Sequence, residues 1–441
     1  MLSPNFTTSY THFAQNLATM IVPTLFGSLA ALASCVAAQS NSSQVLVVDQ
    51  KSFNVLTPVP PPSQANLTTI FVPPGITLND ATAKPFHVYD NAFHDIIGPN
   101  PTLTLIARQD VNPLFHEAVV YPPTDEVFFV QNAGAKDAGT GLNKSNIIQK
   151  ISLSQAAGVA SLRNASGQVQ VQTVNATPPV INSNGQPPFA AFYLSKLMKL
   201  PGATLYRGQI VFTGEGQGNN TAPALYVVNP RPPYNSTILV NNYFGRQWNS
   251  LNDVAINPRN GDVYFTDTLY GYLQNFRPGP ELPNQVYRYN PSTGAVTTVA
   301  DGFELPNGIT FSPNGSYAYV TDTGAQYSNF GYNMTAPASI YQYTVLADGT
   351  FDNRKLFTYV SPGIPDGIHC DTEGNVYSGV GDGVQVWNPS GTLLGKIFLG
   401  TTSANFNFAG KGGLVICAET ELYYASIAAE GAIVESQLPP Q

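Results

Sequence analysis

Short stretches in which apolar and polar residues alternate make up most of the chain from residue 117 onward. An alternation with a period of two, bounded by Gly, Asn, Asp or Pro, predicts β-strands that bury one face. Such stretches cover residues 126–130, 209–213, 224–228, 262–266, 285–289, 318–321, 340–345, 375–379, 383–387 and 422–426. The pattern therefore predicts an all-β domain, with a less regular region at 133–207 that contains one short helix at 192–200.

Four predicted strands begin with the same arrangement of residues. An oxygen-bearing side chain precedes a short apolar run in each, and these four residues are Glu117, Asn252, Asn307 and Asp366. The last three lie 55 residues (307 minus 252) and 59 residues (366 minus 307) apart. A repeat of this length with several strands per unit predicts a β-propeller. Equivalent side chains of successive blades would meet at one mouth of the central channel and form a site for a hard cation.

Asn-Gly and Asp-Gly pairs need separate interpretation, because such pairs usually form hairpin turns. Asn260-Gly261 and Asn314-Gly315 lie between two predicted strands, as hairpin turns do. Asn307-Gly308 and Asp366-Gly367 instead precede the first strand of a unit, about seven residues ahead of its hairpin turn. We therefore interpret the second group as functional positions.

Composition narrows the class of protein. Of the 441 residues, 43% are hydrophobic and only 10% are charged, which excludes a disordered chain and allows a large core. The length fits one large domain or two to three ordinary ones, and propellers often run long as one domain. A net charge of −8 without a Lys/Arg cluster gives no reason to expect nucleic-acid binding.

The N-terminal region has the pattern of a secretion signal. A run of apolar and small residues spans Met20–Ala38, although no Lys or Arg precedes it. The run predicts a signal peptide at 1–38, with either Met1 or Met20 as the start, and hence a secreted, extracellular protein. A membrane anchor is the alternative, and the small residues at the end of the run disfavour it. No later segment is apolar enough to span a bilayer, so no membrane association is expected after signal removal.

The remaining chain agrees with export. Downstream of the signal there are nine sequons, at Asn41, Asn66, Asn143, Asn164, Asn175, Asn219, Asn235, Asn314 and Asn333. In a secreted chain these predict several N-linked glycans. The exported chain would keep two cysteines, Cys370 and Cys417, which form either one disulfide or two buried thiols. The oligomeric state is left open.

The chain divides into three parts. The signal peptide at 1–38 is followed by a Pro- and Asn-rich segment at 39–100, which predicts an irregular N-terminal arm. Residues 101–441 form the propeller. Its first strand, at 103–107, is expected to pair with the last blade and close the ring.

Four motif pairs occur in order over about 117–427. They are FHEA at 115–118 with EVFF at 126–129, NSLNDV at 249–254 with VYFTD at 263–267, LPNGI at 305–309 with YVTDT at 319–323, and PDGI at 365–368 with GNVY at 374–377. In these motifs the chain resembles the senescence-marker-protein/gluconolactonase family, also called luciferin-regenerating-enzyme-like, and most of all its secreted fungal lactonase branch. The resemblance implies a six-bladed propeller with a divalent cation, commonly calcium, at the channel mouth.

The resemblance also implies roles for single residues. Glu117, Asn307 and Asp366 match the family's metal ligands. Asn252 is a fourth polar group, which binds either the metal or the substrate. Ser250 stands where animal members carry an Arg that grips substrate hydroxyls, so it is a candidate substrate contact with altered specificity.

The residue types favour particular chemistry. Carboxylate and amide oxygens suit Ca²⁺ or Mg²⁺, whereas Zn²⁺ normally takes His or Cys. We therefore expect a divalent cation, with Ca²⁺ first and Mg²⁺, Mn²⁺ or Zn²⁺ as alternatives. His116 is a candidate substrate contact, although a strand neighbour of Glu117 can equally point away from the channel. The chain lacks a Gly-x-Ser-x-Gly motif, so a serine-hydrolase nucleophile has no support.

These expectations combine into a secreted, metal-dependent lactonase that hydrolyses small hydroxylated lactones, such as aldonolactones or pantoyl lactone. The cation would polarise the lactone carbonyl, and either Asp366 or Glu117 would take a proton from the attacking water. Two alternatives stay open. One is an esterase or organophosphate hydrolase resembling paraoxonases, and the other is a non-catalytic, calcium-stabilised propeller that binds a ligand.

Overall fold

The structure is a computed structural model that describes residues 43–111, 113–122, 124–131, 147–162, 168–174 and 200–432. These residues belong to one compact unit that spans Ala37–Gln441. The predicted signal peptide and residues 192–199 of the predicted helix lie outside the described residues. Over the described ranges, no helix is both long enough and apolar enough to cross a membrane.

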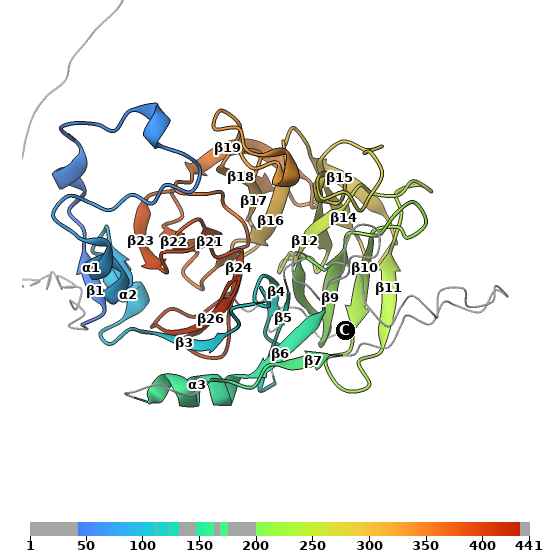
Figure 1. Ribbon diagram of the computed structural model, residues 1–441. Coiled ribbons are helices and arrows are strands. Elements are labelled where there is room, and N and C mark those ends of the chain that lie inside the picture. The colour runs from blue at the N-terminus through green and yellow to red at the C-terminus, as the bar shows by residue number, and fades with distance from the viewer. Residues whose placement is uncertain are drawn as a thin grey trace, which may run out of the picture. The chain divides into compact units, whose positions relative to one another are not determined.

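Six sheets form the blades of a β-propeller, and their strands pair antiparallel except for one parallel pair in the N-terminal arm (Figure 1). Blade one contains β4 (Glu117–Val120), β5 (Glu126–Val130), β6 (Ile148–Ser152) and β7 (Gln172–Val174). Blade two contains β8 (Ala203–Tyr206), β9 (Gln209–Gly214), β10 (Ala224–Val228) and β11 (Ser236–Val240). Blade three contains β12 (Leu251–Ile256), β13 (Val263–Asp267), β14 (Gln285–Tyr289) and β15 (Val296–Ala300).

The other three blades continue this order. Blade four contains β16 (Pro306–Phe311), β17 (Tyr317–Asp322), β18 (Ser339–Val345) and β19 (Phe351–Tyr359). Blade five contains β20 (Ile368–Cys370), β21 (Val376–Val380), β22 (Gly383–Trp387) and β23 (Leu393–Phe398). Blade six contains β24 (Asn405–Phe408), β25 (Gly413–Ala418) and β26 (Glu421–Ser426). The innermost strands β4, β8, β12, β16, β20 and β24 each contact the next, and β24 contacts β4, so the ring is closed.

Short helices occupy connections and the N-terminal arm. The α-helices are α1 (Leu78–Ala83), α2 (Phe93–Ile97), α3 (Leu153–Ser161) and α4 (Tyr270–Leu273). The 3₁₀ turns are η1 (Gln50–Phe53), η2 (Pro62–Gln64) and η5 (Ser328–Phe330). Helix α1 begins with a capping box, in which Thr77 and Asp80 each bond the backbone of the other.

Ring closure uses a strand from the start of the propeller. β3 (Thr102–Arg108) pairs antiparallel with β26 and completes blade six. Figure 1 shows the blue β3 beside the red β26, two segments from opposite ends of the described chain. The predicted closing strand at 103–107 is therefore confirmed. Closure removes the open edge that blade six would otherwise expose.

The N-terminal arm adds to blade five. β1 (Val45–Val47) pairs in parallel with β2 (Phe86–Val88), and β2 pairs antiparallel with β23. Blade five is consequently a six-stranded sheet. The segment expected to be an irregular arm thus supplies two short strands to the propeller.

The apolar core lies between neighbouring blades. Tyr264 of blade three stacks on Phe351 of blade four with ring centroids 5.3 Å apart, and Phe311 meets Tyr264 edge-on at 4.9 Å. Because each blade buries both faces, its inner strands are apolar on both sides. Burying one such ring contributes about 1.5–3 kcal/mol relative to leaving it exposed.

The two remaining cysteines are separate buried thiols. Cys370 ends β20, Cys417 lies in β25, and both are free. They pack in different apolar clusters. Of the two arrangements that the sequence left open, the structure shows buried thiols.

Candidate metal centre and active site

Three innermost strands carry a β-bulge where the predicted ligands lie. The pairing register shifts between Glu117 and Val120, between Leu251 and Val254, and between Pro306 and Ile309. A bulge bends its strand and re-aims the side chains next to it. Glu117, Asn252 and Asn307 therefore stand in bulged segments at equivalent points of their blades.

A repeated threonine holds the backbone at these points. The hydroxyl of Thr266 accepts a hydrogen bond from the Asp253 N–H at 3.0 Å and donates to the Asn307 carbonyl of the next blade at 2.7 Å. Thr213 in the same way bonds Gly202 N–H and Asn252 C=O, and Thr321 bonds Gly308 N–H and Asp366 C=O. We call Thr213, Thr266 and Thr321, all fully buried, the threonine ladder. Each blade in this series thereby anchors the next blade's candidate ligand.

Side chains from blades one, four, five and six come together at the channel mouth. The Asn405 amide donates to Glu117 Oε2 at 2.9 Å. The Asn307 side chain hydrogen-bonds to the Asp366 carboxylate. We call Glu117, Asn307, Asp366 and Asn405 the mouth cluster. Among the described residues, Asp366 Oδ1 and Asn405 Oδ1 are buried and lack a hydrogen-bond partner.

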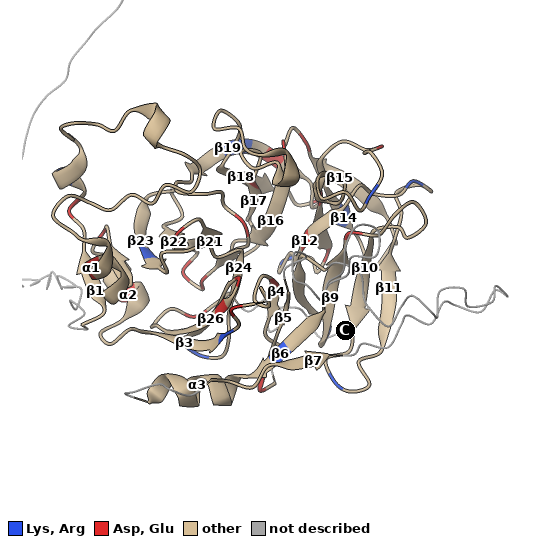
Figure 2. Ribbon diagram, viewed as in Figure 1, with Lys and Arg blue, Asp and Glu red and all other residues tan. Residues whose placement is uncertain are grey.

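The two carboxylates of the mouth cluster are buried and act on one another. Burial raises the pKa of Asp366 to about 7. Burial and, next, the charge of Asp366 raise the pKa of Glu117 well above its usual range. Charged residues are few along the strands (Figure 2). Two neighbouring buried carboxylates of this kind mark a functional site rather than a stabilising feature.

The donor set fits a hard divalent cation. The cluster offers only carboxylate and amide oxygens, which Ca²⁺ and Mg²⁺ prefer. Among the described residues, no group of three or more His, Cys, Asp and Glu could hold a metal ion, so the soft ligand set typical of zinc is absent there. Two buried oxygens without partners are the atoms that such an ion would satisfy.

Asn405 is the member that the sequence did not reveal. It begins β24, the position in blade six that Asp366 holds next to β20 in blade five. It lies 39 residues after Asp366 (405 minus 366), which is shorter than the other spacings, and no glycine follows it. Blade two offers no side chain at its corresponding point, because a Cβ on Gly202 would lie 2.5 Å from Asn252 O.

The glycines that follow two candidate ligands are needed for close approach. A Cβ on Gly308 would lie 2.4 Å from the Asp366 carbonyl, and one on Gly367 would lie 2.7 Å from Asn405 Nδ2. Neither glycine has a positive φ. The Asn-Gly and Asp-Gly pairs at these points thus let neighbouring blades meet, and they do not form hairpin turns.

Asn252 and Ser250 differ from the other predicted residues. Asn252 is 4% exposed, and its side chain makes none of the bonds that join the mouth cluster. Ser250 is fully buried; its hydroxyl donates to Glu215 Oε1 at 2.9 Å and accepts from Gly271 N–H at 3.0 Å. Ser250 therefore holds two loops together, and this burial leaves no surface for the substrate contact that we expected.

His116 does face the mouth cluster. Its Nε2 lies 3.9 Å from Glu117 Oε1, and its Nδ1 lies 2.7 Å from Glu419 Oε1. Burial by itself would lower the pKa of His116, but the carboxylates of Glu419, Glu117 and Asp366 raise it to about 10. The strand rule that would turn His116 away from Glu117 fails because the bulge begins here.

Tyr270 of α4 contacts one of the candidate ligands. Its hydroxyl hydrogen-bonds Thr323 Oγ1 and the Asn307 side chain. The negative charge of Asp366 also acts on this hydroxyl. Because Thr323 Oγ1 donates to the Leu305 carbonyl, it accepts from Tyr270, and Tyr270 in turn accepts from the Asn307 amide. The Asn307 amide group thus donates both to Tyr270 and to the Asp366 carboxylate, and its carbonyl oxygen takes part in neither bond.

A cavity of about 590 Å³ runs along the innermost strands of the ring. It is lined by residues that include Asp253, His369, Asn405 and Asn407, and it reaches Lys411 and Glu430. Burial lowers the pKa of His369 to about 4, so this imidazole is neutral near pH 7. The cavity is the central channel, and the mouth cluster lies at one end of it, where Asn405 belongs to both.

Known proteins share this architecture. The sequence model of one protein family, described as the SMP-30/gluconolactonase/LRE-like region, matches residues 218–420. Lactonohydrolase oryL of Aspergillus oryzae is 30% identical over 350 residues, which cover 76% of this chain and 72% of that protein. The gluconolactonase of Zymomonas mobilis is 30% identical over 172 residues, covering 36% of this chain and 45% of that protein.

A solved structure agrees on the fold. The gluconolactonase from Xanthomonas campestris superimposes with a TM-score of 0.57 at 20% identity, covering 78% of this chain and 94% of that chain. The extent of the lactonohydrolase match establishes the relationship that the motifs predicted. The chain is a member of the SMP-30/gluconolactonase/LRE-like family.

Proposed function

We propose that this protein is a lactone hydrolase whose mouth cluster binds a divalent cation, with calcium first among the candidates. The observation that carries the proposal is the pair of buried carboxylates, Glu117 and Asp366, beside oxygens that lack partners in the described structure. Its relatives named lactonohydrolase and gluconolactonase supply the class of reaction. Glu117, Asn307 and Asp366 would hold the cation, and Asn405 would orient Glu117 through its amide and offer its Oδ1 to the cation.

When bound, the cation would polarise the lactone carbonyl and offset charge that develops on its oxygen. Side chains would supply the proton transfer and the contacts to the substrate. Asp366 would take the proton of the attacking water, with Glu117 as the alternative. Asn252 would contact the substrate, as an uncharged polar group beside the cluster.

We infer the substrate class from the residue at position 250, where the site has no arginine. Ser250 is buried where animal members present an arginine, and nearby Arg277 is committed to backbone carbonyls of Gly218, Thr221, Trp248 and Asn249. Arg277 is therefore not available to grip several substrate hydroxyls. This supports compact lactones, such as pantoyl lactone, over six-carbon sugar lactones.

Hydrolysis of a lactone panel in a pH-stat, with and without chelator, tests the proposal. We expect turnover of lactones that chelator abolishes and calcium restores. Aryl esters and an organophosphate in the same panel test the paraoxonase-like alternative. A protein that binds calcium but hydrolyses no member of the panel would instead be a ligand-binding propeller.

We also propose that the protein is exported and N-glycosylated. The apolar run at Met20–Ala38 and the nine downstream sequons support this. N-terminal sequencing of protein secreted by a fungal host should begin near Gln39, and glycosidase treatment should lower the mass. An intact N-terminus without glycan would contradict the proposal.

A further inference from the structure

His116 and Glu419 meet across the seam between the first and last blades. His116 directly precedes β4, and Glu419 directly follows β25. A carboxylate can only accept, so the 2.7 Å contact means that His116 Nδ1 carries a proton and donates it to Glu419 Oε1. The other ring nitrogen, Nε2, lies 3.9 Å from Glu117 Oε1. The ring is thus held at one nitrogen and faces the mouth cluster with the other.

Both side chains stand on fixed backbone. Phe115 N–H donates to Glu419 C=O at 2.9 Å, and Glu419 N–H donates to Phe115 C=O at 2.7 Å. His116 N–H donates to the Val130 carbonyl at 3.2 Å. The His116 and Glu419 side chains are 25% and 30% exposed, so the pair borders open space at the mouth. A substrate could reach it there without any movement of the blades.

Glu419 occupies a backbone position that does not suit it. Ala418 pairs with Glu421, so Glu419 and Thr420 form a two-residue hairpin turn. Such turns need a positive φ at their first central residue, where Gly, Asn or Asp is usual. Glu419 has φ of +61°. A strained residue at a candidate active site points to a side chain that is needed.

We propose that Glu419 is a positioning residue that holds the His116 imidazole through Nδ1–H, so that Nε2 points at the lactone or its attacking water. This inference rests on the proposed lactonase function. The length of the glutamate side chain is the essential property, because the contact spans two blades. The electrostatic alternative is that only the negative charge of Glu419 matters.

Two variants separate length from charge. Glu419→Gln keeps the length and an accepting oxygen but removes the charge, whereas Glu419→Asp keeps the charge but is one methylene shorter. We expect Glu419→Gln to retain kcat within about threefold of the wild type, and Glu419→Asp to lose about 10- to 100-fold, as for other residues that orient a site. KM should change by less than about threefold in both. Calcium affinity by titration calorimetry should change by less than about threefold in Glu419→Asp, which keeps the negative charge that acts on Asp366.

Stability and the ring itself provide readouts other than turnover. Asp tolerates a positive φ better than Glu, so the melting temperature of Glu419→Asp should not fall, and its lost activity cannot come from unfolding. In proton NMR, the Nδ1–H signal of His116, assigned by its loss in His116→Asn, should persist in Glu419→Gln and disappear in Glu419→Asp. Glu421→Gln is the matched control, because this carboxylate two residues away bonds Tyr423 instead.

Several outcomes would overturn the proposal. Full activity in Glu419→Asp, or loss in Glu419→Gln as deep as in Glu419→Asp, would make Glu419 a charge effect. A loss of calcium affinity in Glu419→Asp that parallels its loss of activity would place Glu419 in the ligand set. If the wild type hydrolyses no lactone, the proposed function fails, and the Nδ1–H signal decides separately whether Glu419 holds His116.

Discussion

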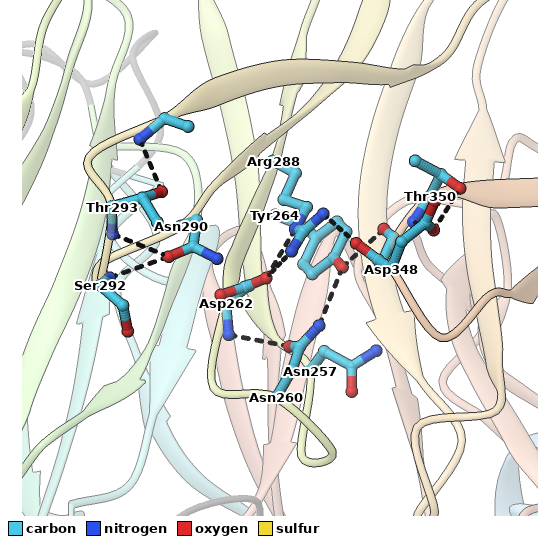
Figure 3. A network of polar contacts seen from close by, with 12 residues as sticks. Asn257, Asn260, Asp262, Tyr264, Arg288, Asn290, Ser292, Thr293, Asp348 and Thr350 are labelled. Atoms are coloured by element: carbon cyan, nitrogen blue, oxygen red, sulfur yellow. Dashed lines mark hydrogen bonds and ion pairs between the residues drawn. The ribbon is translucent and has the colours of Figure 1, made fainter.

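Buried carboxylates have opposite surroundings at the two ends of the blades. At the end of blade three away from the mouth, the Asp262 carboxylate accepts from Arg288 Nε at 2.6 Å, and Arg288 also bonds the Asp348 carbonyl (Figure 3). Tyr264 donates to the Gly349 carbonyl at 2.8 Å. These bonds tie blade three to the hairpin that joins β18 and β19. We call Asp262, Tyr264, Arg288 and their partners in blade four the far-end network.

The mouth cluster is compensated less closely, because the charged His116 lies 3.9 Å from Glu117 Oε1 and is bonded to Glu419 instead. Asp262 has a cation beside it, whereas Asp366 shares its surroundings with a second carboxylate and keeps one buried oxygen without a partner in the described structure. The far-end network satisfies its polar groups internally and so serves stability. In the mouth cluster, by contrast, polar groups stay without partners and are left for a ligand to bind. Local conflict with good folding chemistry is typical of a functional site.

The largest effect should come from Asp366→Asn. Losing a ligand and the water's proton acceptor should lower kcat/KM by at least about 100-fold. Without metal, the melting temperature should stay the same or rise, because one of two repelling buried charges is gone. Steady-state kinetics and thermal unfolding in chelator check both statements, with the exposed Asp301→Asn as the matched control. Retained activity would remove Asp366 from the site.

Arg288→Met tests the other side of the comparison. Removing the guanidinium leaves the nearly buried Asp262 without its cation, which should cost about 3 kcal/mol of unfolding free energy. Urea denaturation measures this loss. The kcat/KM of the folded fraction should stay within about twofold, because the far-end network does not touch the substrate. A loss of activity as large as that of Asp366→Asn would erase the distinction between the two ends.

The next largest effect is expected for Ser250→Ala. The change removes a donor from Glu215 and an acceptor from the Gly271 N–H, so we expect a loss of about 1–3 kcal/mol in stability. The ratio of kcat/KM for gluconolactone to that for pantoyl lactone should not change. A shift of that ratio by tenfold or more would restore Ser250 as a substrate contact.

The smallest effect is expected for Tyr264→Phe. The ring keeps its stacking on Phe351, and only the bond to the Gly349 carbonyl is lost. Urea unfolding should show a loss of about 1 kcal/mol without a change in kcat. No measurable loss would mean that water satisfies the carbonyl at this end of the blades.

Strand periodicity and the repeated strand starts were sufficient to predict the propeller, its closing strand and three members of the mouth cluster. Asn405 escaped because its spacing is short and no glycine follows it. The threonine ladder was present in the motifs as Thr266 and Thr321, yet a threonine in a strand says nothing until the neighbouring blade is placed beside it. Sequence spacing does not reveal bulges, so it could not determine which way His116 or Ser250 points.

Closure of the ring by β3 has a consequence for synthesis of the protein. Thr102 pairs with Ser426 and Arg108 with Glu421, so the first propeller strand emerges from the ribosome long before its partner exists. Contacts this distant along the chain fold slowly and at a high cost in loop entropy. Until then, both strands expose unpaired edges that can capture other chains. A nascent chain truncated anywhere before residue 421 should therefore depend on chaperones, however complete its other five blades are.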